Sequence, residues 1–365
     1  MIETNRYSKL YEILDTLRIP LIYLVIIEHT VNMGLFDGRS VFYSNSLYKY
    51  ISNLLHLNMG YIAVPFFFMV SAYFFFRKQT KWNWFVYAGQ LKKRVKSLLI
   101  PYLLWNILIV AIVYAKYTGL SYLGIASHKE PIPSLYDIFW GFPSNFPTWY
   151  VKELMCMMLL APLFYAFVRY TKIVGLVGLI AVYVWLARSL PVSGGLSMTS
   201  FTFFGIGAYL ALYDIDLIAV CGKHKKLFAG LALGFLILST WMTGSACHGN
   251  IRCVYILFGL VSVINLFHYL LRFPALKTRL LVLSNTTFFI YCAHEVLILN
   301  WLKGGYLRLP IADSPWGMIL GYFLIPAMCM AICIGLYYLL KKISPKLLAL
   351  LTGGRVSPRL HSLKN

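Results

Sequence analysis

Charged residues are scarce in this chain, and acidic residues are the scarcest of them. Only 12% of the 365 residues are charged, and the 33 Lys and Arg far outnumber the 12 Asp and Glu. Hydrophobic residues make up 60%, and the mean hydropathy is +0.71. Since about a quarter of the residues in a soluble domain are charged, this composition excludes a soluble globular protein. It predicts an all-α, polytopic membrane protein.

Metal-binding and redox spacings are also missing. The seven cysteines include no CxxC pair, and no histidines stand at an i, i+4 spacing, so we predict no metal site. Cys247 and Cys253 flank a short polar loop. If that loop faces an oxidising compartment the two can form a disulfide, and two free thiols are the alternative.

The first apolar stretch lacks a small-residue cleavage site, so we expect it to remain as a helix rather than be removed as a signal peptide. No internal repeat is evident, so the inverted-repeat signature of many transporters is missing. The net charge of +21 does not indicate nucleic-acid binding, because the cations lie between apolar stretches rather than on a soluble basic face.

Long apolar stretches alternate with short loops along the whole chain. A spanning helix needs about twenty apolar residues. About ten spans are predicted: 14–34, 58–76, 97–117, 149–168, 173–190, 200–213, 227–243, 252–271, 282–302 and 317–340. The sixth is short, and a tilted or broken helix is expected there.

Lys and Arg concentrate in every second loop, as cytoplasmic loops do. They follow spans two, four, six, eight and ten, and include Lys92, Lys93, Arg94, Lys96, Lys223, Lys277 and Lys341. Both termini are therefore predicted to be cytoplasmic. Among the five intervening outer loops, we expect specificity to reside in 35–57, 118–148 and 303–316.

Arg18 and His29 share the first span and are separated by eleven positions. At about 100° per residue this step returns to within roughly 20° of the same face, and it covers about 16 Å along the helix axis. Ionisable groups in a membrane usually face the bundle interior or a water-filled cavity. A cation near the inner side suits an anionic donor, and a neutral imidazole further out suits a general base.

Other ionisable residues in spans are secondary candidates. Asp15 is predicted to pair with Arg18, three residues on, and Glu28 to contact a neighbouring span. His294 and Glu295 in span nine either bind acceptor and orient His29 or form a clamp between helices. Trp149 and Glu153 in span four carry the same two interpretations. The preceding outer loop, which ends in Phe146-Pro147-Thr148-Trp149-Tyr150, is either a lid or acceptor platform or a simple interfacial belt.

Five segments, in order, resemble the integral-membrane acyltransferase type 3 family over nearly the whole chain. They are the Arg18 to His29 spacing, Val64-Pro-Phe-Phe-Phe-Met-Val-Ser-Ala-Tyr-Phe74, Arg94-Val-Lys-Ser-Leu-Leu-Ile-Pro-Tyr-Leu-Leu-Trp105, Trp149-Tyr150 with Glu153-Leu154, and Leu283-Ser-Asn-Thr-Thr-Phe-Phe-Ile-Tyr-Cys-Ala-His294. Ala72 replaces a glycine usual in the second segment, and Pro20 is unusual in the first. A kink at Pro20 would change how Arg18 projects.

The resemblance implies a single membrane-embedded acyltransferase domain, residues 1–345, with a short basic cytoplasmic tail, 346–365. It implies transfer of an acyl group, usually acetyl, from acyl-CoA to a hydroxyl of a surface glycan or its lipid-linked precursor. His29 would be the base and Arg18 would orient the donor. Arg94, Lys93 and Lys96 would contact the coenzyme phosphates, or else serve topology and anionic lipid.

Acyl-CoA, in a typical member acetyl-CoA, would be a co-substrate, and no permanently bound cofactor is expected. The expected partners are membrane lipid, the glycan acceptor and polysaccharide-synthesis proteins, in the cytoplasmic (inner) membrane. Two alternatives stay open: a transporter or flippase for a glycan or lipid-linked sugar, and a relative that transfers succinyl.

Overall fold

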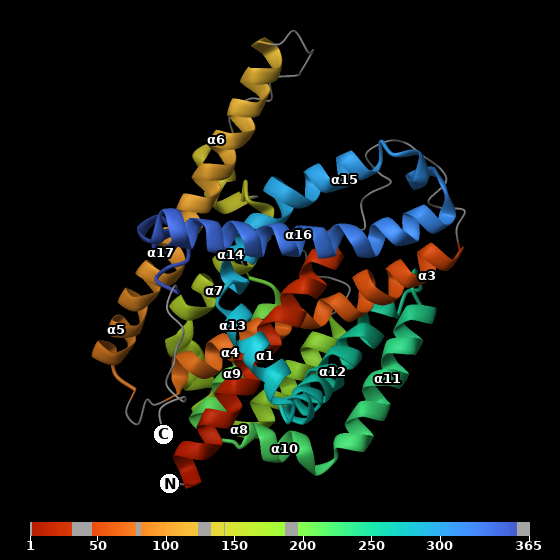
Figure 1. Ribbon diagram of the computed structural model, residues 1–365. Helices are drawn as coiled ribbons and strands as arrows, with labels where there is room; N and C mark the ends of the chain where they lie inside the picture. Colours follow the sequence, from red (N-terminus) through yellow and green to blue (C-terminus); the bar gives the residue numbers. More distant parts are fainter. Residues whose placement is uncertain are drawn as a thin grey trace.

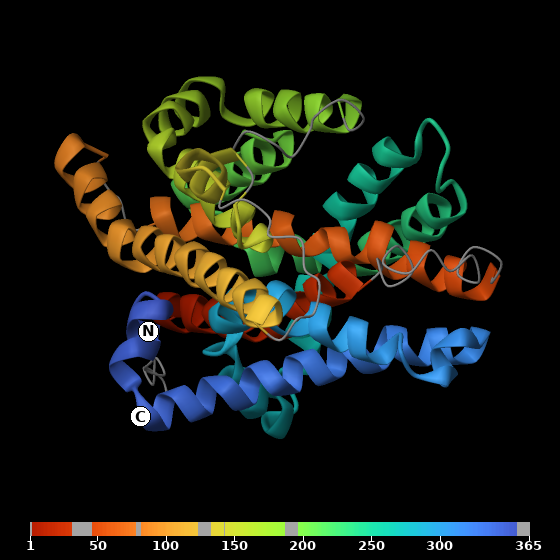
Figure 2. The ribbon, with the colours of Figure 1, turned by 90° about the horizontal axis from the view of Figure 1, so that it is seen from above.

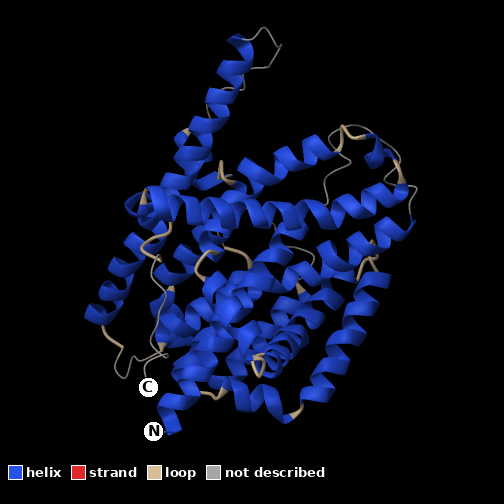
Figure 3. Cartoon of the chain, in the orientation of Figure 1, coloured by secondary structure: helices blue, strands red, loops and turns tan. Residues whose placement is uncertain are grey.

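The computed structural model describes residues 2–30, 46–77, 82–122, 133–141, 143–186 and 196–355. These residues are almost all helical, and no strand occurs among them (Figure 3). The elements are α1 (Ile2–Thr30), α3 (Ser46–Leu54), η2 (Leu55–Met59), η3 (Gly60–Ile62), α4 (Ala63–Phe76), α5 (Trp84–Arg94), η4 (Val95–Leu99), α6 (Ile100–Tyr122), η5 (Asp137–Gly141), η6 (Phe146–Thr148), α7 (Trp149–Leu159), α8 (Ala161–Trp185), α9 (Met198–Leu212), α10 (Leu217–Lys223), α11 (Lys225–Trp241), α12 (His248–Leu270), α13 (Pro274–Ser284), α14 (Thr287–Ala293), η7 (His294–Leu299), α15 (Asn300–Tyr306), η8 (Pro310–Asp313), α16 (Pro315–Ile343) and α17 (Pro345–Leu351). The all-α prediction is confirmed.

Five helical segments of the described chain are long and apolar enough to cross a membrane, and two bent helix pairs raise the number to seven. The five are Ser46–Phe76, Trp84–Gly119, Ala161–Trp185, His248–Leu270 and Pro315–Ile343. The chain is therefore a multi-pass membrane protein, whereas the count of ten spans stays a prediction. α11 illustrates the difference, because its 17 residues lie at the lower limit of a spanning length.

Breaks in the helices fall close to the predicted loops. α8 contains a non-helical residue, Lys172, with a φ of 53°, where the prediction separates spans four and five. α9 and α10 meet at 108°, which fits the short, broken sixth span. The pair Pro274–Ser284 and Thr287–Tyr306 bends by 52° within the expected ninth span. Residues 31–34, 187–190 and much of the loops 35–57 and 118–148 lie outside the described chain.

α1 runs through the middle of the bundle in both views (Figures 1 and 2). It packs against α12, α13, α14, α16 and the η2–η3 segment. Its apolar positions are buried almost completely, among them Ile13, Leu17, Ile22 and Ile26. The helix continues without interruption through Pro20. A helix that contacts neighbours on most sides can present its few polar residues only toward a cavity or toward polar partners.

α4 and α9 approach each other closely at Gly207. A Cβ atom at this position would lie 2.1 Å from the carbonyl oxygen of Met69 and 2.8 Å from the Cβ of Ala72. Small residues allow this approach between membrane helices, where van der Waals packing replaces the hydrophobic effect as the source of stability. The contact fixes α4, which forms one wall of the cavity described below.

The first part of the predicted basic cytoplasmic tail, 346–365, packs against the helical bundle. α17 packs against α6, and the indole nitrogen of Trp105 donates a 3.0 Å hydrogen bond to the carbonyl oxygen of Leu351. Arg355 donates to the carbonyl oxygens of Ser97 and Thr352, both at 2.8 Å. Residues 345–355 therefore belong to the bundle, because a buried indole N–H requires an acceptor and this segment provides it. Residues 356–365 of the expected tail lie outside the described chain.

Candidate active site

A cavity of about 2280 Å³ follows one side of α1. The α1 residues that line it recur every three or four positions: Ser8, Tyr11, Glu12, Asp15, Arg18, Ile22, Val25, Glu28 and His29. That repeat is the spacing of one helix face. The stripe predicted from the separation of Arg18 and His29 is therefore confirmed as the wall of a single cavity. α4, η4, α7, α12 and α14 supply much of the rest.

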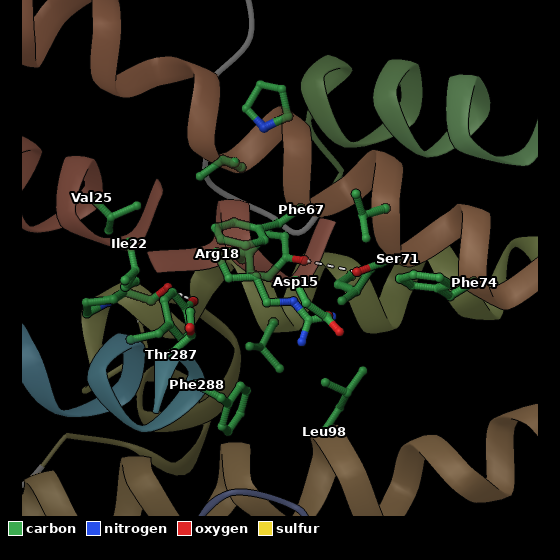
Figure 4. A pocket seen from close by; sticks show the side chains of 18 of the residues that line it. Asp15, Arg18, Ile22, Val25, Phe67, Ser71, Phe74, Leu98, Thr287 and Phe288 are labelled. Atoms are coloured by element: carbon green, nitrogen blue, oxygen red, sulfur yellow. Dashed lines mark hydrogen bonds and ion pairs between the residues drawn. The ribbon is translucent and has the colours of Figure 1, made fainter. Parts of the chain in front are cut away.

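One end of the cavity is rich in arginine. Arg18 pairs with Asp15 at 3.0 Å, as predicted, and both project from α1 toward Ser71 and Phe74 of α4, with Phe288 close by (Figure 4). Arg94, at the end of α5, lines the same cavity, and so does Arg77. Cations from distant parts of the sequence thus line one cavity, and this end favours an anionic ligand.

Arg355 adds a further positive charge at this end. Its guanidinium lies 4.2 Å from the centre of the Phe288 ring. Desolvation, together with the neighbouring charges of Arg18 and Arg94, lowers the pKa of Arg355 to about 10. It therefore remains protonated at neutral pH. Three arginines that repel one another persist at the cavity wall, which is an arrangement suited to a multiply charged anion.

His29 lies at the other end of the cavity, next to the C-terminus of α1. Its Nδ1 atom is 3.5 Å from Oε1 of Glu295, and its ring meets Phe146 edge to face at 5.8 Å. The His294 ring is 5.3 Å away. Because Nδ1 faces a carboxylate, the neutral tautomer with its proton on Nδ1 is favoured. In that tautomer Nε2 carries no proton and can accept a proton from a substrate.

The end of α1 is held by a buried lysine. Lys303 of α15 is 4% exposed, and its Nζ atom donates a 2.9 Å hydrogen bond to the carbonyl oxygen of His29. The last four carbonyl groups of a helix lack partners within the helix, and a cation there also interacts favourably with the helix dipole. Lys303 thereby fixes the backbone that carries His29.

A π-helical segment brings two residues of the ninth span to His29. η7 begins at His294, and both His294 and the adjacent Glu295 approach the His29 ring. Adjacent residues of a regular α-helix point about 100° apart, and a π-helical insertion changes that orientation. The predicted role of this pair in orienting His29 is compatible with these contacts.

Buried amides fix the segment that carries Phe146. Asn106 of α6 donates to Thr148 Oγ1 at 3.1 Å and accepts from the backbone N–H of Asn145 at 2.9 Å. The Asn145 side chain donates to the carbonyl oxygen of Cys292 at 2.9 Å. This network ties α6, η6 and α14 together, so the end of the predicted lid or belt is part of the site wall.

The remaining predicted residues separate into two groups. Trp149, Glu28 and Arg94 line the large cavity, whereas Lys93 and Lys96 are exposed and do not line it. Glu153 is buried behind the wall, where it accepts a 2.7 Å hydrogen bond from Ser197, a lining residue. We find no position for Lys93 or Lys96 in the site.

The sequence argument missed Arg355, Lys303, His56 and Phe146 as site residues. Three of them stood in segments interpreted as loops or tail, where a basic residue normally indicates topology rather than chemistry. Phe146 belonged to an aromatic group that fitted an interfacial belt. A local signal existed only for Lys303, a lone cation directly after an apolar span.

The cysteines and possible metal ligands add nothing to this site. Cys247 is exposed, Cys253 is buried, and both are free thiols, so the disulfide alternative is not present. Within the described ranges, no group of three or more His, Cys, Asp or Glu residues has the arrangement of a metal site.

The comparisons with known proteins agree with this geometry. A family profile described as acyltransferase domain matches residues 11–338. The chain is 27% identical over 345 residues to the succinoglycan biosynthesis protein ExoH of Rhizobium meliloti (strain 1021), and the alignment covers 90% of this chain and 85% of ExoH. No solved structure matches the chain significantly.

Proposed function

Because the chain belongs to the acyltransferase domain family, we propose that it transfers an acyl group from cytoplasmic acyl-CoA to a hydroxyl of a cell-surface glycan or its lipid-linked precursor. The similarity to a succinoglycan biosynthesis protein supports a polysaccharide acceptor. The clustering of cations in alternate loops supports a cytoplasmic donor side and a location in the inner membrane.

One observation carries the proposal: a single cavity joins the arginine end to His29. Coenzyme A carries several phosphate charges at one end and its thioester at the other, on a long arm. The eleven-residue step from Arg18 to His29 spans about 16 Å along α1, so phosphates at Arg18, Arg94 and Arg355 would leave the thioester free to approach the imidazole. Typical ligand pockets have volumes of about 300–1000 Å³, so this cavity has room for more than one small ligand.

His29 would act as the general base. Its Nε2 takes the proton from the acceptor hydroxyl as that oxygen attacks the thioester carbonyl. The C–S bond then breaks, the ester is formed, and the coenzyme thiolate leaves and receives the proton held by His29. The Glu295 carboxylate, 3.5 Å from Nδ1, stabilises the transient imidazolium. Arg18 and its neighbours hold the donor and take no part in the proton transfers.

The test is acyl transfer in membranes that carry the native acceptor. A strain from which the gene is deleted is complemented with wild type, His29→Ala, Arg18→Ala or the control His224→Ala, whose exposed imidazole lines neither cavity. Labelled acyl-CoA is supplied on the cytoplasmic face, and label in purified glycan is counted. We expect wild type and His224→Ala to transfer, His29→Ala to lose at least about a hundredfold, and Arg18→Ala to require more donor.

Normal acyl content in both site variants, at normal protein levels, would overturn the proposal. Movement of glycan without a new ester would favour the transporter alternative. Acetyl is the acyl group we favour, and succinyl is the alternative. Mass spectrometry of the esterified glycan distinguishes the two.

A further inference from the structure

A second cavity of about 270 Å³ borders His29. Its lining residues are Glu28, His29, His56, Phe146, Glu295, Asn300 and Lys303. We call it the small chamber. Glu28, His29 and Phe146 also line the large cavity, so these three residues form the partition between the two spaces. His29 therefore faces a second ligand space in addition to the proposed donor cavity.

The small chamber is built from the predicted outer side of the protein. His56 lies in the predicted outer loop 35–57, Phe146 in 118–148 and Lys303 in 303–316. Three of the five predicted outer loops thus contribute one residue each. The arginine end of the large cavity adjoins the predicted cytoplasmic segments instead. The large cavity also reaches the predicted outer side, where Gly141, Pro143 and Ser197 line it, and the two spaces meet at His29.

Polar atoms at the small chamber lack partners. Nδ1 of His56 and Oε2 of Glu295 are buried and have no hydrogen-bond partner within the described part of the chain. A buried polar group without a partner costs about 1–3 kcal/mol, so such groups usually mark a bound polar ligand or water. Two of them beside one small space indicate a ligand with several hydrogen-bonding groups.

The chemistry of the lining selects a neutral polyhydroxyl ligand. Carboxylates accept hydrogen bonds, the Lys303 ammonium donates, and imidazole and the Asn300 amide can do both, as sugar hydroxyls also can. Two carboxylates, one ammonium and two imidazoles leave no excess positive charge. A free carboxylate or phosphate would be repelled by Glu28 and Glu295. The volume, just below that of a typical drug-sized pocket, fits one sugar ring.

We propose that the small chamber binds the sugar ring of the acceptor whose hydroxyl is acylated, with Phe146 as an apolar wall and His56 and Asn300 as hydrogen-bonding positions. This inference rests on the proposed function. The acceptor hydroxyl reaches His29 from the small chamber while the thioester reaches it from the large cavity. His56 and Asn300 are then specificity-determining residues rather than acid–base groups.

The test uses His56→Leu and Asn300→Leu, each expressed in the deletion strain and also purified in lipid nanodiscs. Labelled acetyl-CoA is supplied to the membranes, and transfer to the native envelope glycan is measured together with the KM for acetyl-CoA. We expect transfer to fall roughly tenfold or more, as the loss of a hydrogen bond to the ligand would cause, while the KM for acetyl-CoA changes less than about twofold. His224→Leu is the matched control. His56→Gln, which keeps a hydrogen-bonding side chain, is expected to retain most of the transfer, and His56→Ala replaces His56→Leu should that variant not accumulate.

The outcomes separate the two proposals. Absence of transfer by the wild type from both labelled acetyl-CoA and labelled succinyl-CoA refutes the proposed function itself. Transfer by the wild type together with unchanged transfer by the His56 and Asn300 variants refutes only the small chamber as an acceptor site. A rise in the KM for acetyl-CoA in these variants also overturns it, because the chamber would then hold part of the donor.

Discussion

Replacing Glu295 by Gln tests whether the carboxylate beside His29 contributes to the chemical step. The substitution keeps the shape of the side chain and removes its charge. Oε1 lies 3.5 Å from Nδ1 of His29, and both side chains are mostly buried, at 17% and 15% exposed. At an effective dielectric constant of about 20, a full charge pair at this distance is worth roughly 5 kcal/mol.

That figure is an upper limit for the effect on the rate. Lys303 lies next to the pair, its charge opposes that of the imidazolium, and the ion pair is only partly formed while His29 takes the proton. A loss of about 2 kcal/mol in transition-state stabilisation is therefore reasonable, which corresponds to a decrease in kcat of roughly 30-fold. The KM for acyl-CoA should stay unchanged, because the arginine end of the cavity is untouched.

The assay is steady-state acyl transfer by purified protein in lipid nanodiscs, with wild type, Glu295→Gln, His29→Ala and the double variant. If Glu295 acts through His29, the double variant should be no slower than His29→Ala. Glu12→Gln, which removes a carboxylate paired with Lys277 at 2.6 Å at the far end of α1, is the control. An unchanged kcat in Glu295→Gln, or losses that add in the double variant, would refute the reasoning.

Three further predictions follow from the structure. Arg355→Ala should raise the KM for acyl-CoA by about ten- to a hundredfold with little change in kcat, because a charge-assisted hydrogen bond is worth about 1.5–3 kcal/mol. A smaller rise in Arg355→Lys would show that the charge matters. An unchanged KM in initial-rate measurements would exclude a role of Arg355 in donor binding. Because the pKa of Arg355 is about 10, its charge and its contribution to donor binding are present at neutral pH and are lost only as the pH rises through about 10. The ratio of the KM of Arg355→Ala to that of wild type should therefore be constant from about pH 6 to 8. A ratio that changes in this range would contradict the prediction. Gly207→Val should prevent accumulation of folded protein, because the valine side chain would overlap the Met69 carbonyl. The control Gly230→Val, which has open space around it, should give a normal yield of folded protein, measured by gel filtration. Equal yields of the two variants would contradict the packing argument.

Several parts of the fold follow from local chemistry. Long apolar stretches identified helices near residues 14–34, 97–117 and 317–340, where α1, α6 and α16 occur. The short sixth stretch indicated a broken element, and α9 and α10 indeed bend sharply. Span boundaries were predicted less well, because the predicted span 149–168 runs through Pro162, where α7 has ended at Leu159 and α8 has begun.

Some features of the candidate site could likewise be predicted from local sequence, and others could not. The face shared by Arg18 and His29, and the Asp15 pair, depend only on the period of a helix, so sequence spacing was enough to predict them. The contact of Glu295 with His29 was an open alternative, because spacing in one helix says nothing about which neighbour it meets. Arg94 lines the large cavity, whereas Lys93 and Lys96 point away from it on α5 and η4. The charge pattern of the sequence does not predict which of the three side chains faces the cavity.

The sequence by itself determined the membrane class and the polar stripe on α1, since these depend on composition and on helical period. The direction of the spans, expected from Lys and Arg, stays a prediction. Only the tertiary structure decided that Arg355 joins Arg18 and Arg94, that Lys303 caps the end of α1, and that His56 and Phe146 border a second cavity at His29. These residues are tens to hundreds of positions from His29 or Arg18. Their meeting depends on how helices pack and bend, which local sequence patterns do not specify.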